Sequence, residues 1–450
     1  MAAQRCAANL KRIFKKGQSA KDVTGGKPLK AGSKALNICL LTYRGNPFCG
    51  GQGVYVQYLA QELVRLGHRV HVVSGPPYPW VGDGVQLHKI DSRIFFGYPS
   101  SQILAQTPLK QIMSPLSFYE FSSSRMGVFP EIRAFSFRAY SRLRQLLRQE
   151  PLDVLHDNQC LGYGFLLMKA FKIPLVATIH HPLSIDRRTW FETPSKLRQK
   201  IRMLLYYPLV MQKIVARNMD RIVTVSKDAS LQIQKDFGIQ EGRIRVVYNG
   251  LDSHVFKPLP QQQRVPKRIL FVGNVADRKK GILYLLQAMA KVDSEAHLVI
   301  VDGGTPTRVS TQDLVKALGL EHRVTVTGKI DRDELVRLYS SAQIAVVPSL
   351  YEGFGFPAAE AMACEVPLVA TAAGALPEVV GTDGSCGVLV PPRDPMALAD
   401  AINALLSQPG KCVEMGKAGR RRVLSCFTWR QAAQQLVDMY MEMKGAHHKP

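Results

Sequence analysis

Strand-like and helix-like segments alternate along most of this chain. From Leu36, "LNICLLTY" is an apolar run typical of a buried strand, and "VYVQYLAQELVRLG" then repeats its apolar residues at helical spacing. A loop with Gly50, Gly51 and Gly53 joins the two, and "HRVHVVS" predicts the next strand. The folded part of the chain therefore begins with a β-loop-α-β unit.

Similar units recur on both sides of residue 250. The further predicted strands include "LDVLHDN", "PLVATIHH", "DRIVTVS", "IRVVYNG", "KRILFVGNV", "AHLVIVDGG", "RVTVTGKI" and "QIAVVPS". The predicted helices include "GYGFLLMKAFK", "KDASLQIQKDFG", "KGILYLLQAMAKV", "DRDELVRLYSSA", "FPAAEAMAC" and "DPMALADAINALL". Such alternation indicates parallel sheets with helices on both faces. The predicted fold class is α/β, with two Rossmann-like doubly wound parallel-sheet domains facing an interdomain cleft.

A polar, Pro/Gln-rich segment near residues 255–266 suits a linker between two domains. We therefore expect an N-terminal extension at 1–34, a first domain at 35–255 and a second domain at 256–427. The last predicted helix, 428–445, is expected to pack back on the first domain.

Charge is distributed unevenly between the two halves. The chain of 450 residues has a net charge of +24, and residues 1–250 contain 36 Lys/Arg and 15 Asp/Glu, against 23 and 20 in 251–450. The first half is therefore expected to meet an anionic partner. Residues 1–34 contain nine Lys/Arg and one acid, Asp22. They suit a solvated disordered tail, a basic amphipathic helix or an organelle transit peptide.

The cysteine pattern and the hydropathy limit the cellular compartments in which the protein is expected. Eight cysteines are scattered without a CxxC pair, which indicates free thiols in a reducing cytosol. No apolar run approaches the roughly 18 residues of a membrane-spanning helix, and the N-terminus has no apolar core of a secretory signal.

Two glutamates flank a glycine-rich turn in "SLYEGFGFPAAEAMA". The strand "QIAVVPS" precedes the turn, and Pro357 suits the first turn of a helix, which would place Glu360 inside that turn. Gly353 and Gly355 allow a ligand to approach the backbone, and the helix N-terminus favours a phosphate. Glu352 and Glu360 could then accept hydrogen bonds from sugar hydroxyls on either side of a diphosphate. Alternatively, Glu360 only favours the helix dipole and Glu352 is solvated.

A second loop of the same predicted sheet is basic. "FVGNVADRKKG" places Arg278, Lys279 and Lys280 after a strand whose end should face the same edge. These side chains could bind phosphates, although a basic loop is more often simply solvated.

The sequence resembles the retaining glycosyltransferases of family 4, which have the two-domain GT-B architecture. The resemblance covers about 400 of the 450 residues and rests on these segments: "CGGQGVYVQYLAQELVRLGHRVHVVS", "PLVATIHH", "RIVTVS", "VVYNGLD", "KKG" and "YEGFGFPAAEAMACEVPLVATAAGALPEVVG". The last segment matches the E-x7-E signature of that family.

The resemblance implies a role for each matching residue. It implies that Glu352 contacts the donor sugar, that Glu360 contacts the nucleotide ribose and that Lys280 contacts the donor diphosphate. His180 would face the transferred sugar. The other implied donor contacts are the backbone of Phe354, Gly355 and Phe356, the base-binding edge near Ile330, and the first-domain loop at Gly50 and Gly51.

One position departs from the family pattern. The family usually has arginine directly after the strand-end glycine, Gly273, where this chain has Asn274. Arg278 lies four residues later and could supply the missing charge.

The family resemblance implies a front-face displacement without a protein nucleophile. A diphosphate oxygen would take the acceptor proton, and Lys280 and Arg278 would stabilise the negative charge that grows on the leaving group. The oxocarbenium-like sugar would lie near His180 and Glu352. A hydrolase with two carboxylates is a rival interpretation, but strand-loop-helix geometry should not place both carboxylates around one bond.

Other motifs carry less weight. Asp331 and Asp333 form a D-x-D, but before "ELVRLYSS" they suit a helix N-terminus better than a metal. Neighbouring histidines on a strand, such as His180 and His181, point to opposite faces and should not share an ion. No required metal and no cofactor are therefore expected, with the nucleotide-diphosphate sugar as substrate. "GQG" at 51–53 is a weak partial NAD fingerprint, because no acid follows at the required spacing.

The sequence gives the least information about the acceptor substrate. Two basic stretches with aromatic residues, 133–148 and from Arg187 to Arg221, suit an anionic membrane surface, or equally helices packed on the first sheet with solvated charges. We expect a cytoplasmic enzyme, peripheral on the inner membrane face, that acts on a lipid or lipid-linked glycan.

Three alternatives stay open. The first is a glycosyltransferase with a soluble acceptor, as in glycogen or sucrose metabolism. The second is a catalytically silent sugar-nucleotide-binding protein, which only Asn274 favours. The third is a nucleic-acid-binding protein, which we do not expect because the chain has no recognisable module beyond its net charge.

Overall fold

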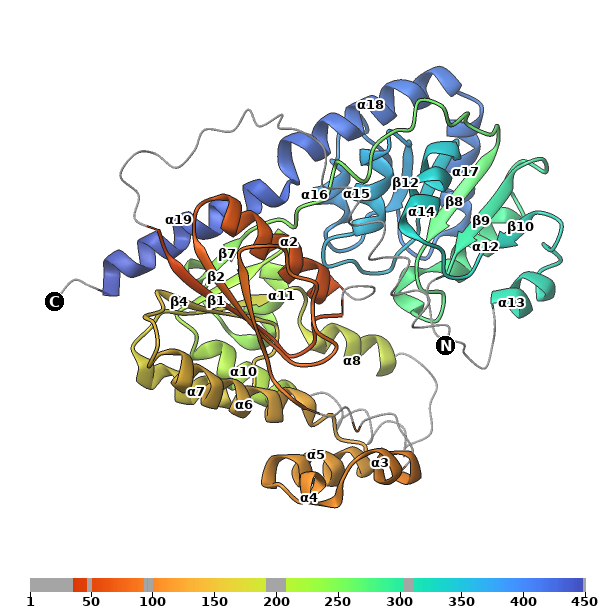
Figure 1. Cartoon of the computed structure of the whole chain (residues 1–450). Helices are drawn as coiled ribbons and strands as arrows, with labels where there is room; N and C mark the ends of the chain where they lie inside the picture. The colour runs from red at the N-terminus through yellow and green to blue at the C-terminus, as the bar shows by residue number, and fades with distance from the viewer. Residues whose placement is uncertain are drawn as a thin grey trace. The chain divides into compact units, whose positions relative to one another are not determined.

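The computed structural model describes residues 35–46, 51–92, 95, 100–191, 208–302 and 311–447 (Figure 1). Residues Leu36–Pro450 form one unit that contains two parallel sheets. The basic extension 1–34 and the predicted donor-loop residue Gly50 lie outside the described residues.

The first sheet has seven parallel strands in the order β3-β2-β1-β4-β5-β6-β7. The strands are β1 (Asn37–Thr42), β2 (Arg69–Ser74), β3 (Val85–Lys89), β4 (Val154–Asn158), β5 (Leu175–Ile179), β6 (Arg221–Thr224) and β7 (Ile244–Val246). Every residue of β4 and β5 is buried, as expected for central strands covered on both faces.

Helices cover both faces of the first sheet. Ile38 and Leu40 of β1 point to a core shared with α2 (Gly51–Arg65) and α19 (Trp429–His447), whereas Cys39 and Leu41 point to the opposite core. That second core is formed with α6 (Glu131–Leu146), α7 (Gly164–Met168), α10 (Leu209–Arg217) and α11 (Lys227–Phe237). In Figure 1, α19, at the blue end of the colour bar, therefore lies against the red α2, far from it in sequence.

The second sheet has six parallel strands in the order β10-β9-β8-β11-β12-β13. The strands are β8 (Arg268–Val272), β9 (His297–Val301), β10 (Val324–Val326), β11 (Ile344–Val347), β12 (Leu368–Thr371) and β13 (Val388–Val390). One face packs on α12 (Ile282–Met289), α13 (Thr311–Ala317) and α17 (Pro395–Leu406). The other packs on α14 (Arg332–Ser341), α15 (Phe356–Ala363), α16 (Leu376–Val380) and α18 (Pro409–Cys426).

The two sheets confirm the predicted fold class of two doubly wound α/β domains. In each sheet the chain order reverses once, between β1 and β4 in the first and between β8 and β11 in the second. Loops leave such a reversal point in opposite directions, so that open space for a ligand forms there, beyond the carboxyl ends of the strands.

Several local expectations are confirmed and others are corrected. Asp331 caps α14 through the amide of Glu334, and Asp333 lies in its first turn, so the D-x-D pair serves a helix end. The predicted glycine loop after β1 is shorter than expected, because α2 already begins at Gly51. A side-chain carbon on Gly53 would lie only 2.0 Å from the oxygen of Asn46, which explains a glycine inside this helix.

The stretch 133–148 is not a free amphipathic surface. It lies mostly in α6, whose apolar face, including Phe135, Ala139 and Leu143, is buried in the first core. Arg138 of the same helix donates two hydrogen bonds to the buried carboxylate of Glu120. The alternative of a helix packed on the first sheet is therefore correct for this stretch. Much of the second basic stretch lies outside the described residues.

Helices between β3 and α6 had no counterpart in the sequence analysis. They are α3 (Ser100–Gln106), α4 (Leu109–Ile112) and α5 (Pro115–Arg125). Nothing in the described part of the chain forms a helix with both the length and the apolar character needed to cross a bilayer.

Candidate active site

The loop between β11 and α15 has the predicted strand-loop-helix form. Gly355 is the N-cap of α15, and its φ of +98° lies in the region that glycine adopts most readily. A side-chain carbon there would lie 2.8 Å from Cδ2 of Leu376, so space also requires glycine. The prediction that Glu360 lies in the first turn is wrong. The helix begins at Phe356, and one turn takes 3.6 residues, so Glu360 lies in the second turn.

Glu352 is held in place at both its side chain and its backbone. The carboxylate is almost fully buried, and its Oε1 accepts hydrogen bonds from Ser349 Oγ and Lys280 Nζ, each at 2.8 Å. Its carbonyl accepts the amide of Ala375 at 2.9 Å. A side-chain carbon on Gly374 would lie 2.3 Å from that carbonyl oxygen, so the loop after β12 fits closely under the glutamate.

Lys280 reaches Glu352 from the loop after β8. It ends the short helix η3 (Arg278–Lys280), which Asp277 caps through the amide of Lys279. The next residue, Gly281, has a φ of +66°, and a side-chain carbon there would lie 1.9 Å from the oxygen of Pro348. The β8 and β11 loops therefore touch without side chains between them, which brings the ammonium to the carboxylate.

The pair keeps Lys280 charged. Burial by itself lowers the pKa of Lys280, but the carboxylate of Glu352 more than offsets this effect, and the pKa is raised. The ammonium therefore remains available to a phosphate at neutral pH.

The neighbouring loop residues contribute differently. Asn274 is exposed, and its Oδ1 accepts the amide of Ala276 at 2.9 Å, so its side-chain oxygen stabilises its own turn. Gly273 packs against Lys280, since a side-chain carbon there would lie 3.6 Å from Cγ of that lysine. Arg278 is exposed at the start of η3 and is not brought into contact with the Lys280–Glu352 pair.

Glu360 faces a different partner. Its Oε2 accepts a hydrogen bond from the hydroxyl of Tyr339 on α14 at 3.0 Å. Burial raises the pKa of Glu360 to about 7, although Tyr339, Arg332 and Lys280 each oppose the rise. The carboxylate is half-buried, so its second oxygen can meet a ligand hydroxyl.

His180 follows β5 of the first sheet and is oriented by Asn158, which ends β4. Nδ2 of Asn158 donates to the carbonyl of Gln52 at 3.0 Å, so its Oδ1 must accept from Nε2 of His180 at 2.8 Å. This arrangement puts the proton of a neutral imidazole on Nε2. Burial, with smaller effects of His181 and His156, lowers the pKa of His180 to about 3. The ring is therefore neutral at physiological pH.

Gln159 holds the backbone around this histidine. Its side chain accepts the amide of His180 at 2.8 Å and donates to the carbonyl of His181 at 3.0 Å. Gln159 itself has a φ of +56°, and Asp157 stabilises the turn by accepting the amides of Cys160 and Leu161. The polar run "HDNQC", which begins within the predicted strand "LDVLHDN", was the available sequence signal for this cluster, and the sequence-based prediction missed it.

A buried polar chain links His180 to the C-terminal helix. Tyr440 of α19 hydrogen-bonds to Nδ1 of His156, whose Nε2 meets the hydroxyl of Thr178 at 2.7 Å. The hydroxyl of Tyr55 on α2 also meets Thr178, at 3.2 Å, and the Tyr55 ring stands edge-on to His180 at 4.8 Å. Nothing in the sequence pattern joins these residues, because α19 is almost 300 positions from β4.

The two parts of the site meet at the signature loop. A side-chain carbon on Gly353 would lie 2.8 Å from the carbonyl oxygen of His180. Beside this contact, the rings of His181 and Tyr351 lie 6.4 Å apart. The histidine of the first domain and the glutamate loop of the second are therefore adjacent.

A carboxylate makes a second contact between the domains. Glu378 of α16 accepts the amides of Lys227 and Asp228 at the start of α11, at 2.7 and 2.8 Å, and the hydroxyl of Tyr248 at 2.9 Å. Negative charge is favourable at a helix N-terminus, so this contact stabilises the juxtaposition of α16 and α11.

The remaining predicted donor residues lie on different elements. Phe354 is buried against Phe356 and Phe427, with ring centroids 5.2 and 5.5 Å away. Ile330 follows β10 directly before α14 and packs against the second core. Gly51 starts α2. Among the residues that the structure describes, no group of three or more His, Cys, Asp or Glu side chains is placed to hold a metal ion.

The geometry combines one kind of phosphate-binding group with two hydroxyl-binding groups. Lys280 offers positive charge, Glu352 and Glu360 offer acceptor oxygens, and the N-terminus of α15 offers backbone amides between them. A neutral histidine lies across the signature loop. This set suits a ligand with a phosphate between two sugars.

Comparisons with known proteins identify the family of this chain. The sequence model described as "Glycosyl transferases group 1" matches residues 257–422, and the one described as "Glycosyltransferase Family 4" matches residues 49–255. The MMP alpha-(1->4)-mannosyltransferase of Mycolicibacterium hassiacum is 38% identical over 408 residues, which cover 90% of this chain and 98% of that relative.

Two further matches extend the comparison. The D-inositol 3-phosphate glycosyltransferase of Xylanimonas cellulosilytica is 28% identical over 91% of this chain and 98% of its own length. The solved structure of sucrose-phosphate synthase from Thermosynechococcus elongatus superposes with a TM-score of 0.71 at 25% identity, covering 91% of this chain and 100% of that one.

The fold is thus the GT-B architecture of glycosyltransferases, with the candidate site at the sheet edge where the two domains touch. The chain belongs to glycosyltransferase family 4.

Proposed function

We propose that this protein transfers a hexosyl group from a nucleotide-diphosphate sugar to an acceptor hydroxyl with retention of the anomeric configuration. The observation that carries the proposal is the ion pair between Lys280 and Glu352, set beside the helix that holds Glu360. This arrangement places a positive charge that can bind a diphosphate close to carboxylates that can accept hydrogen bonds from sugar hydroxyls. Mannose is the first sugar to test, because the 38% identical relative is named a mannosyltransferase.

In this mechanism the acceptor attacks from the face that the leaving group occupies. The bond from the anomeric carbon to the diphosphate oxygen breaks, and that oxygen takes the acceptor proton as the new glycosidic bond forms. Lys280 stabilises the diphosphate more strongly as its charge grows. Glu352 holds the sugar hydroxyls, Glu360 the ribose hydroxyls, and the neutral His180 lies beside the sugar without adding positive charge against an oxocarbenium-like carbon. No step uses a metal ion.

Arg278 has a secondary place in this proposal. It is exposed at the start of η3, four residues after Asn274, and the ion pair to Glu352 is made by Lys280. Lys280 therefore carries the larger share of the leaving-group stabilisation.

We propose a lipid or lipid-linked glycan at an anionic membrane surface as the acceptor. Two observations support this: the +21 charge of residues 1–250, and five large exposed apolar side chains on α3–α5 and directly after them. These are Leu104, Leu109, Met113, Phe118 and Met126, with exposed fractions from 48% to 72%. Exposed apolar groups gathered in one region are typical of contact surfaces.

A soluble glycan or sugar phosphate is the second candidate acceptor. The specific observation in its favour is the similarity to a sucrose-phosphate synthase and to a D-inositol 3-phosphate glycosyltransferase over most of the chain.

The test uses the purified full chain. Mannose and glucose donors with each of the common nucleotide bases are screened by thermal shift, and the donor that binds is then assayed for transfer into membrane lipid extracts and into soluble glycans. Transfer with retained configuration, judged by NMR of the product, supports the proposal. Donor binding without either transfer or donor hydrolysis instead supports the silent sugar-nucleotide-binding alternative.

A further inference from the structure

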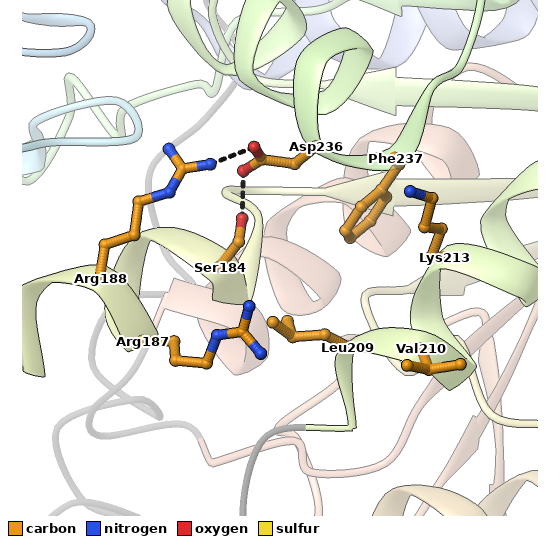
Figure 2. Close-up of a pocket in the computed structure, with 8 residues that line it drawn as sticks. All are labelled: Ser184, Arg187, Arg188, Leu209, Val210, Lys213, Asp236 and Phe237. Atoms are coloured by element: carbon orange, nitrogen blue, oxygen red, sulfur yellow. Dashed lines mark hydrogen bonds and ion pairs between the residues drawn. The ribbon is translucent and has the colours of Figure 1, made fainter. Parts of the chain in front are cut away.

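A cavity lies on the first domain, outside the loop cluster described above. It has a volume of about 250 Å³ and is bounded by α8 (Leu183–Phe191), α10 and α11 (Figure 2). The residues that line it are Ser184, Arg187, Arg188, Leu209, Val210, Lys213, Asp236 and Phe237.

Helical spacing brings the polar groups to one wall. Ser184, Arg187 and Arg188 stand at i, i+3 and i+4 on α8, so they share one face. On α10, Leu209 and Lys213 are four residues apart and share the face opposite. In Figure 2 the Arg187 and Lys213 side chains therefore come to the cavity from different helices.

The cavity has an excess of positive charge. Asp236 accepts hydrogen bonds from Ser184 and Arg188. Arg187 and Lys213 form no ion pair with any residue that the structure describes. Among the described residues that line the cavity, three basic groups thus stand with a single carboxylate, which leaves an excess of two positive charges there.

Such an arrangement is unfavourable without an anion. Arg187 and Lys213 are both partly buried, and Leu209, Val210 and Phe237 form the apolar part of the lining. Partial burial weakens the hydration of each charge. An anion in the cavity would offset this cost.

The size and shape of the groups define the class of anion. A volume of about 250 Å³ has room for several water molecules, and it suits a phosphate and part of a sugar or glycerol unit. A planar guanidinium binds two oxygens of a phosphate at once, and an ammonium adds a point charge. The apolar wall suits the C–H face of the attached organic group.

We propose that this cavity binds the phosphate monoester of an organic phosphate, with Arg187 and Lys213 as its ligands and Arg188 held in place by Asp236. The location of the cavity suggests that it binds part of the acceptor, and this role rests on the proposed function. Helix α8 starts at Leu183, three residues after His180, and at a rise of 1.5 Å per residue Arg187 lies about 6 Å along it. A phosphate bound there would anchor an acceptor beside the reaction centre.

The experiment measures binding without turnover. Isothermal titration calorimetry compares wild-type protein with Arg187→Gln, Lys213→Gln and the double variant, using inorganic phosphate, glycerol 3-phosphate and glucose 6-phosphate. Each single variant should weaken binding of the organic phosphates about tenfold, the scale of one charge-assisted hydrogen bond. The double variant should show no saturable binding. Lys169→Gln, which removes an exposed charge elsewhere on the first domain, is the matched control and should bind like wild type.

Two further arms keep the result interpretable. Lys213→Arg retains the charge and should bind within about threefold of wild type, which shows that a loss in Lys213→Gln is not misfolding. Flotation with phosphatidylcholine vesicles, with or without phosphatidic acid, distinguishes a lipid headgroup from a soluble phosphate as the source of the monoester.

The outcomes separate this inference from the proposed function. If wild-type protein binds an organic phosphate or phosphatidic acid vesicles and the double variant does not, the site is supported whatever the transfer assay gives. If the double variant binds as wild type does, or wild type binds none of these probes, the site is refuted even when sugar transfer is observed.

Discussion

Replacing Lys280 by methionine tests the central ion pair. The substitution keeps the length of the side chain and removes the charge that lies 2.8 Å from Glu352. We expect turnover of the bound donor to fall about 100-fold, about 2.7 kcal/mol of transition-state stabilisation, which is the scale measured for losing one preorganised charge stabiliser.

The same change should also lower stability, and the structure gives the size. The Glu352 side chain is 9% exposed and that of Lys280 is 24% exposed. Removing a partner from a fully buried pair costs about 3–5 kcal/mol, and partial exposure of the lysine reduces this to about 1–3 kcal/mol of unfolding free energy. The double variant Lys280→Met with Glu352→Gln removes the unpaired charge and should recover most of the stability but none of the turnover.

The assay combines urea denaturation with single-turnover kinetics on the donor identified by thermal shift. Lys279→Met is the matched control, because its ammonium lies 3.9 Å from Asp277 and not at Glu352. A loss of turnover below about threefold in Lys280→Met would show that another group stabilises the leaving diphosphate. Recovery of turnover in the double variant would refute the reasoning in a different way, because the ion pair would then matter only for folding.

Substitutions at three other positions test the rest of the site. Glu360→Ala should weaken donor binding about tenfold, and unchanged affinity would exclude a contact with the ribose. Because burial raises the pKa of Glu360 to about 7 from an ordinary 4.5, donor affinity should increase between pH 6 and 8 in wild type and stay flat in Glu360→Gln. By the same linkage, its protonated form stabilises the fold fully below about pH 4.5, and this stabilisation is lost as the pH rises through 7. Tyr440→Phe removes the hydroxyl partner of His156 and should lower the unfolding free energy by about 1–3 kcal/mol in urea titrations; an unchanged midpoint would mean that a water replaces it. Gly355→Ala should lower the melting temperature and reduce donor affinity, because φ is +98° and Leu376 occupies the space; wild-type values for both would contradict the described loop.

The sequence was informative wherever physical signals are local. The helix predicted at "DPMALADAINALL" is α17, which Asp394 caps through the amides of Met396 and Ala397, with Pro395 as the first helical residue. The strand-loop-helix form around Glu352 and Glu360 was also predictable, because glycine, proline and apolar periodicity act within a few residues. The predicted helix "FPAAEAMAC" begins at Phe356, as α15 does, and only the turn that contains Glu360 was misplaced.

The partners of each site residue were not predictable in the same way. Glu352 and Lys280 are 72 positions apart, and they meet because β8 and β11 are neighbours at the point where the strand order reverses. The sequence also left open whether the basic stretch in α6 contacts a membrane or packs on the first sheet. The structure shows that the apolar face of α6 is buried in the core on that sheet.

By itself, the sequence of this protein determined the alternation of strands and helices, the caps and turns, and the types of residue that the ligand-binding edges carry. These features follow from backbone geometry and from hydrophobic periodicity, which act over a few residues. Only the tertiary structure decided that Lys280 neutralises Glu352, that Asn158 sets the tautomer of His180 and that Tyr440 reaches His156 from the C-terminal helix. Those contacts depend on strand order and helix packing, which bring together groups whose distance along the chain carries no information about their distance in space.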